Sequence, residues 1–257
     1  MKTILTSAAV VLMAGSMLGA APHDTSFAKS IETTHGQKAY RSKEVLKADL
    51  TVNFGGNTMI DGTMYFDIDS ERVRIEQKDG TTMVWDGERA WITPAESEMQ
   101  GARFHLRTWT YFLAAPFKLN DPGSHMDLAG SLPLMDGKVM ETGKLTFGNN
   151  VGDSPDDWYI VYRDDKNRMA AMSYIVTYSM SAEEAEAEPH AIVYNEYATV
   201  DGVTFSTSWT FHDWANDKGI FGDELGNAKI SNISFVRENN DWFTKPANAR
   251  EDALPGS

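Results

Sequence analysis

Residues 103–123, RFHLRTWTYFLAAPFKLNDPG, decide how this chain can fold. Trp109, Phe112 and Leu113 fall at positions i, i+3 and i+4, which is the spacing of one face of a helix. A second apolar stripe leaves only a narrow polar face, and Pro116 predicts where the helix ends. A helix that is apolar around most of its circumference needs two apolar neighbours, or one neighbour and an apolar ligand. This helix therefore either packs as an ordinary core element or forms the wall or lid of a cavity.

Alternating apolar and polar residues, which are typical of half-buried strands, flank the helix on both sides. Before the helix we predict about five strands, at residues 46–54, 60–68, 73–76, 83–85 and 90–92. After it we predict six more, at residues 139–147, 158–162, 169–178, 192–200, 203–211 and 230–236. Asp-Gly pairs stand between several of these runs, where hairpin turns need a positive φ. The fold class is therefore mainly β, with an antiparallel sheet of about eleven strands and at least one helix.

Three segments lack a clear apolar period. We interpret residues 22–43 as a polar lead-in, residues 124–134 as a loop or a short irregular helix, and residues 181–188 as an exposed acidic hairpin tip. Because no internal repeat divides the chain, we expect residues 22–257 to form a single domain.

The N-terminal residues 1–21 have the pattern of an export signal. Lys2 precedes an apolar run from Ile4 to Leu18, and small residues follow at positions 19–21. The run of about fifteen residues is shorter than a membrane-spanning helix. We therefore expect a cleaved signal peptide and a mature protein that is periplasmic or secreted.

Charge and cysteine content exclude several classes of function. The chain has 23 Lys and Arg residues against 37 Asp and Glu residues, a formal net charge of -14. This balance argues against nucleic acid as a partner, and it allows peripheral or transient membrane contact at most. The sequence contains no cysteine, which removes disulfides, thiolate catalysis and cysteine metal sites.

A search for catalytic or metal-binding motifs returns little. The six histidines lack the spacing of a metal site, and no nucleophile elbow or phosphate-binding loop follows the signal segment. The acidic segments 153–157 and 164–167 do not have the ligand spacing of a calcium loop, so we interpret both as turns. We therefore expect no metal, no cofactor and no catalysis. An enzyme acting on a glycan or lipid through acidic residues that the sequence does not place remains an alternative.

The first strand block contains three short motifs, which are Gly62-Thr-Met-Tyr-Phe66, Arg72-Val-Arg74-Ile-Glu76, and Asp86-Gly87 followed by Trp91. These motifs resemble those of the periplasmic lipoprotein-carrier superfamily of LolA and LolB. The segment Ala115-Pro-Phe-Lys-Leu-Asn-Asp-Pro-Gly123 resembles an uncharacterised family of exported bacterial proteins assigned to the same superfold. The resemblance implies a half-open β-barrel wrapped around a helix, with an apolar cavity that accepts acyl chains.

The resemblance and the helix pattern together imply a set of cavity-lining residues. These are Phe66, Trp85, Trp91, Trp109, Phe112 and Leu113. We therefore predict a noncatalytic protein that binds a lipid or another apolar ligand between the curved sheet and the helix at 103–116. Seven Trp, nine Tyr, twelve Phe and thirteen Met suit such a cavity, but they can equally fill a closed core. A structural or interaction module with a filled core is thus a further alternative, and the sequence does not indicate an oligomeric state.

Overall fold

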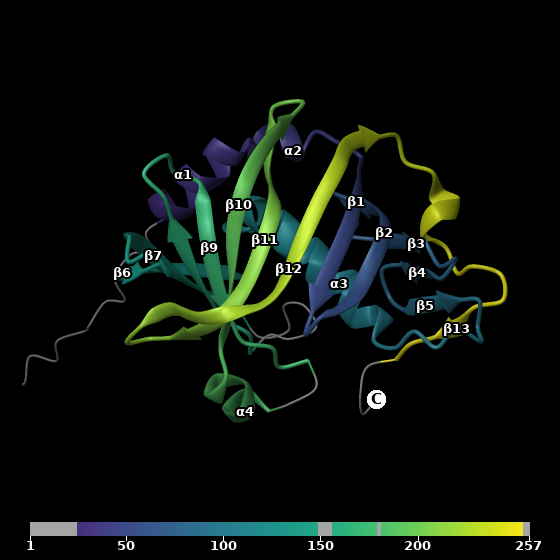
Figure 1. Cartoon of the computed structure of the whole chain (residues 1–257). Helices are drawn as coiled ribbons and strands as arrows, with labels where there is room; N and C mark the ends of the chain where they lie inside the picture. Colours follow the sequence, from purple (N-terminus) through teal and green to yellow (C-terminus); the bar gives the residue numbers. More distant parts are fainter. Residues whose placement is uncertain (1–24, 149–155, 179–180, 254–257) are drawn as a thin grey trace, which may run out of the picture.

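The computed structural model of the chain describes residues 25–148, 156–178 and 181–253 (Figure 1). All its strands join one antiparallel sheet of thirteen strands, in the order β13-β5-β4-β3-β2-β1-β12-β11-β10-β9-β8-β7-β6. Because β13 and β6 stand at opposite ends of this order, the sheet is open rather than closed into a barrel. The predicted signal peptide, residues 1–21, lies outside the described residues.

In the sequence, the strands form two blocks, one before and one after helix α3 (Ala102–Ala114). The first block contains β1 (Val45–Phe54), β2 (Asn57–Asp67), β3 (Val73–Gln77), β4 (Thr82–Trp85) and β5 (Ala90–Thr93). The second contains β6 (Ser124–Pro133), β7 (Val139–Phe147), β8 (Tyr159–Arg163), β9 (Met169–Tyr174), β10 (His190–Val200), β11 (Val203–Ala215) and β12 (Gly219–Val236), and β13 (Arg250–Glu251) follows near the C-terminus. The helices are α1 (Thr25–His35), α2 (Gln37–Tyr40), α3 (Ala102–Ala114) and α4 (Ala182–Ala187), with 3-10 turns η1 (Ala115–Phe117) and η2 (Asn240–Phe243).

The main hydrophobic core lies between one face of the sheet and the helices α1, α2 and α3. Along β1, the alternate residues Leu46, Ala48, Leu50 and Val52 are buried in this core, as their alternation predicted. Helix α3 crosses the same face behind β11, β12 and β1 in the view of Figure 1, and it packs against β3, β4 and β5. The mainly antiparallel β fold around a helix is therefore confirmed, with thirteen strands in place of about eleven.

Helix α1 covers the part of the sheet that α3 leaves open. Phe27 and Ile31 are buried one turn apart, and His35 follows one turn later at the same spacing. Gly143 of β7 allows this close packing, because a Cβ there would lie 2.6 Å from the Met126 sulfur and 2.9 Å from the Phe27 ring. The interpretation of residues 22–43 as a polar lead-in was therefore wrong for the described part of that segment.

Two further segments differ from their predictions. Residues 124–133 form β6, the last strand of the sheet, and most of its side chains are exposed on both faces. An edge strand of this kind has no apolar alternation, which is why the pattern indicated a loop. The acidic segment 181–188 is exposed and lies in the connection between the paired antiparallel strands β9 and β10, as the predicted hairpin tip requires, but it forms helix α4 there. Ser181 and Glu184 make a capping box at its start, and Ala185 is its buried contact.

Candidate ligand cavity

A cavity of about 440 Å³ lies between α3 and the strands β8 and β9. Phe104, Tyr111 and Phe112 contribute the helical wall, and Tyr159 and Tyr174 contribute the sheet wall. The helix supplies these side chains because positions three, four and seven residues apart share a face. The cavity therefore lies beside the helix that the apolar spacing singled out.

Aromatic rings make up much of the cavity wall. The ring centroids of Phe112 and Tyr174 are 4.9 Å apart, and those of Tyr111 and Tyr159 are 5.2 Å apart. Phe147 meets Tyr159 edge to face at 5.8 Å. Such rings present rigid apolar surface to a ligand, and the phenols add polar atoms at its edge.

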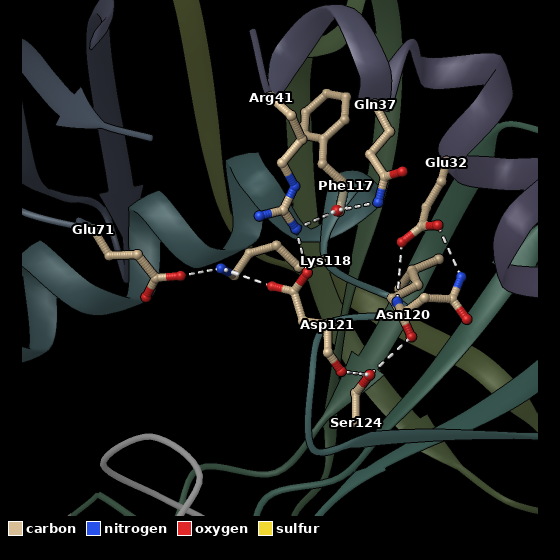
Figure 2. A network of polar contacts seen from close by, with 10 residues as sticks. Glu32, Gln37, Arg41, Glu71, Phe117, Lys118, Asn120, Asp121 and Ser124 are labelled. Carbon is tan, nitrogen blue, oxygen red and sulfur yellow. Dashed lines mark hydrogen bonds and ion pairs between the residues drawn. The ribbon is translucent and has the colours of Figure 1, made fainter. Parts of the chain in front are cut away.

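Charged side chains form one end of the cavity, and Figure 2 shows most of them. Lys118 Nζ contacts the carboxylates of Glu71 and Asp121, the latter at 3.1 Å, and an Arg107 guanidinium nitrogen lies 3.7 Å from Glu71. Burial alone would raise the pKa of the Glu71 carboxyl, but the charges of Lys118 and Arg107 and the Lys118 hydrogen bond outweigh it and lower that pKa. Two cations and two carboxylates thus hold one another in fixed positions.

The loop that carries Lys118 and Asp121 is fastened from the N-terminal helices. Arg41 forms an ion pair with Asp121, and Gln37 Nε2 donates a hydrogen bond of 3.0 Å to the Phe117 carbonyl (Figure 2). Helix α2 and the residue that follows it, which are far from this loop in sequence, therefore position the charged end of the cavity.

Asp157 is a further acidic residue of the cavity wall. Burial raises the pKa of its carboxyl, although hydrogen bonds from the Thr177 backbone and hydroxyl, at 3.0 and 2.7 Å, act in the opposite direction. Of the acidic cluster 153–157, residues 153–155 lie outside the described residues. The turn at 164–167 is a hairpin turn in which Asp164 accepts backbone hydrogen bonds from Lys166 and Arg168.

The structure places the six predicted ligand-binding residues at different sites. Phe66 and Phe112 line the cavity. Trp109, 4% exposed, packs instead among aromatic rings that include Phe54 and Phe211, and Leu113 packs in the main core. Both residues belong to α3 and face the main core rather than the cavity.

Trp85 and Trp91 lie farther along the first strand block. The guanidinium group of Arg103 lies 4.5 Å from the centre of the Trp85 ring, so this tryptophan meets the N-terminal part of α3. Trp91 Nε1 donates a hydrogen bond of 2.7 Å to Asp86, and Lys245 lies over its ring. Its neighbours in β5 belong to the main core, so Trp91 faces the other side of the sheet. Whether any of the six residues contacts a ligand stays a prediction.

Sequence reasoning missed the tyrosines and the ionic end of the cavity. The charged residues are Glu71, Arg107, Lys118 and Asp121. Glu71 is far from the other three in the sequence, and only the fold brings it next to them. Lys118 lies within the segment 115–123 that carried a family resemblance, which was the one available signal.

Two observations concern metals and membranes. Within residues 25–148, 156–178 and 181–253, no group of three or more His, Asp or Glu side chains is arranged to hold a metal ion. None of the helices in the same ranges combines the length and the apolar character that crossing a bilayer requires.

Comparison with known proteins identifies the class of fold. No protein-family model and no curated protein matches the sequence. A crystal structure of a LolA superfamily protein from Nitrosomonas europaea matches 85% of this chain and 97% of its own length, with a TM-score of 0.54 and 11% identity. A DUF1329 family protein from Desulfovibrio piger matches 84% of this chain and 96% of its own length, with a TM-score of 0.49 and 12% identity. The chain has a LolA-like fold, which confirms the resemblance at the level of architecture.

Proposed function

We propose that this chain is an exported, noncatalytic protein that binds the apolar part of a lipid or acyl-chain ligand in the cavity beside α3. The observation that carries the proposal is the cavity itself, about 440 Å³ in volume, with an aromatic wall and a charged end. Small-ligand sites in proteins commonly have volumes of about 300 to 1,000 Å³ and walls of this composition. Phe66 and Phe112 are the two predicted residues that contact the ligand in this proposal.

The charged residues favour binding over catalysis. Glu71 and Asp121 are paired with Lys118, and the third cavity carboxyl, Asp157, accepts two hydrogen bonds from Thr177, so none of the three is a free general base. The open volume also argues against an interaction module with a filled core. Likeness to a LolA superfamily structure supports a carrier or binding role and a periplasmic or secreted location.

Fluorescence of the apolar probe N-phenyl-1-naphthylamine tests the proposal. Purified protein, extracted with solvent to remove bound lipid, should enhance the probe's emission with saturable binding. Val176 lines the cavity and is only partly buried, so Val176→Trp should fill part of the volume and weaken probe binding at least about ten-fold.

The matched control adds the same bulk outside the cavity. Val139 of β7 is 62% exposed, and Val139→Trp should leave probe binding unchanged. Equal probe binding by both variants, or none by the unmutated protein, would contradict the proposal. Fractionation of the native host, with Edman sequencing of the exported form, separately tests the location and the expected cleavage near Ala21 or Pro22.

A further inference from the structure

Tyr159 and Tyr174 are buried tyrosines whose hydroxyls have no hydrogen-bond partner among the described residues. They are directly paired across the antiparallel strands β8 and β9, so both side chains point to the same face of the sheet. Their exposed fractions are 8% and 6%, and both line the cavity. Neither hydroxyl oxygen is completely enclosed by protein atoms. Because both residues line the cavity, we take the accessible surface of each hydroxyl to face it.

Other buried tyrosines of the sheet are satisfied by protein groups. The Tyr194 hydroxyl donates to the Phe112 carbonyl at 2.9 Å, and the Tyr162 hydroxyl accepts a hydrogen bond of 2.7 Å from Trp214 Nε1. Buried polar groups in proteins are hydrogen-bonded in the large majority of cases, and an exception calls for a partner such as water or a ligand. A water molecule or a ligand in the cavity can supply the missing hydrogen-bond partner of Tyr159 and Tyr174.

The two phenols are donors in this setting. Burial raises the pKa of both Tyr159 and Tyr174 well above the ordinary value, so they stay protonated at neutral pH. Tyr111, whose ring lies 5.2 Å from that of Tyr159, lines the same cavity and also has its pKa raised by burial. Three neutral O–H groups therefore stand within an apolar wall.

We infer that the ligand is an acyl compound whose carboxyl or ester oxygens accept hydrogen bonds from Tyr159 and Tyr174, with Tyr111 beside them. This inference rests on the proposed function of the same cavity. A pure hydrocarbon would displace water from the phenols and leave their O–H groups unpaired, which loses affinity. An acyl oxygen replaces that water while the alkyl chain covers the aromatic wall.

Competition experiments separate acyl recognition from general apolar binding. N-phenyl-1-naphthylamine contains no oxygen, so its affinity reports on the apolar cavity alone. Methyl dodecanoate and dodecanoate each displace it, and the measured quantity is the ratio of each competitor's affinity to that of the probe. Tyr159→Phe and Tyr174→Phe remove one hydroxyl each without removing the ring. Each substitution should lower the ratio about three-fold, and the double variant about ten-fold.

Tyr162→Phe is the matched control, because it makes the same change in β8 on the opposite face of the sheet. It should leave the ratio unchanged. If the affinity ratio of the double variant falls for only one competitor, the ester or dodecanoate, the result supports the inference and identifies which acyl group the tyrosines recognise. An unchanged ratio for both competitors, with normal probe binding, overturns the inference but leaves the proposed function standing. Absence of probe binding in the unmutated protein overturns both.

Discussion

His105 and Trp109 form a buried polar pair one turn apart on α3. Trp109 Nε1 donates a hydrogen bond of 2.9 Å to His105 Nδ1, which fixes a neutral ring with its proton on Nε2. Burial lowers the pKa of His105 to about 4, against a smaller opposing effect of Asp252. In the unfolded chain a histidine has a pKa of about 6.5. The unfolded state therefore binds more protons between these values, and folded stability decreases as the pH falls from about 6.5 toward 4.

Substitution of this histidine should make the protein less sensitive to acid. We expect proton binding by His105 in the unfolded state to lower the free energy of unfolding by about 2 kcal/mol at pH 5 relative to pH 7. Urea unfolding of the His105→Gln variant should thus show a smaller stability difference between the two pH values than the unmutated protein. Burial also lowers the pKa of His35, which remains in the variant, so part of the sensitivity persists. His125→Gln, at an exposed position, is the control, and an equal pH response of both variants would refute the assignment.

The orientation of a side chain could be predicted from the sequence only where the spacing of apolar residues distinguishes one face of a helix or strand from the other. Phe112 was found because helical spacing places it on an apolar stripe, and it does line the cavity. Tyr159 and Tyr174 were not found because every residue of β9 and most residues of β8 are buried, on both faces of the sheet. Apolar alternation disappears in such strands, so the sequence does not tell which face meets the helix.

At the scale of elements, Glu32 joins α1 to the loop between α3 and β6. This residue is 4% exposed, and its carboxylate accepts hydrogen bonds from the Asn120 backbone at 3.0 Å and from the Asn120 amide side chain at 2.8 Å (Figure 2). The loop in question carries Lys118 and Asp121. A single buried carboxylate therefore connects the docking of α1 to the charged end of the cavity.

Removal of this carboxylate should destabilise the protein. Glu32→Ala leaves the Asn120 N–H groups without their partner, and we expect a loss of about 1 to 3 kcal/mol in the free energy of unfolding. Chemical denaturation measures the loss. Lys29→Ala, at an exposed position of the same helix, should change stability by less than about 0.5 kcal/mol. Similar values for the two variants would show that the Glu32–Asn120 contact does not fasten the helix.

For the molecule as a whole, the alternating strands were sufficient to predict an antiparallel sheet around a helix. They were not sufficient to predict the cavity, because its charged end combines Glu71 from the turn after β2, Arg107 from α3, and Lys118 and Asp121 from the following loop. Such contacts depend on how a thirteen-stranded sheet curves around α3. No local pattern encodes that curvature, whereas helix and strand periods are local properties of the chain.

The C-terminal segment completes the sheet at the end opposite β6. Strand β13 pairs with β5 through Arg250 and Ile92, and Phe243 of η2, 1% exposed, lies under the Arg72 guanidinium group. Neither η2 nor β13 was predicted, since both are too short to show a period. This segment both buries an aromatic ring and covers the edge of β5.

Deletion of residues 239–257 should therefore weaken the protein in two ways. Loss of a buried phenylalanine costs about 3 to 5 kcal/mol, which corresponds to a decrease in Tm of about 6 to 20 °C for a chain of this size. The uncovered edge of β5 should also promote self-association through strand pairing, which light scattering detects. Deletion of residues 254–257 alone, outside the described residues, is the control and should change neither quantity. If the long deletion keeps the Tm and the monodispersity of the short one, the C-terminal segment is not part of the folded sheet, and the order of strands at this end has to be revised.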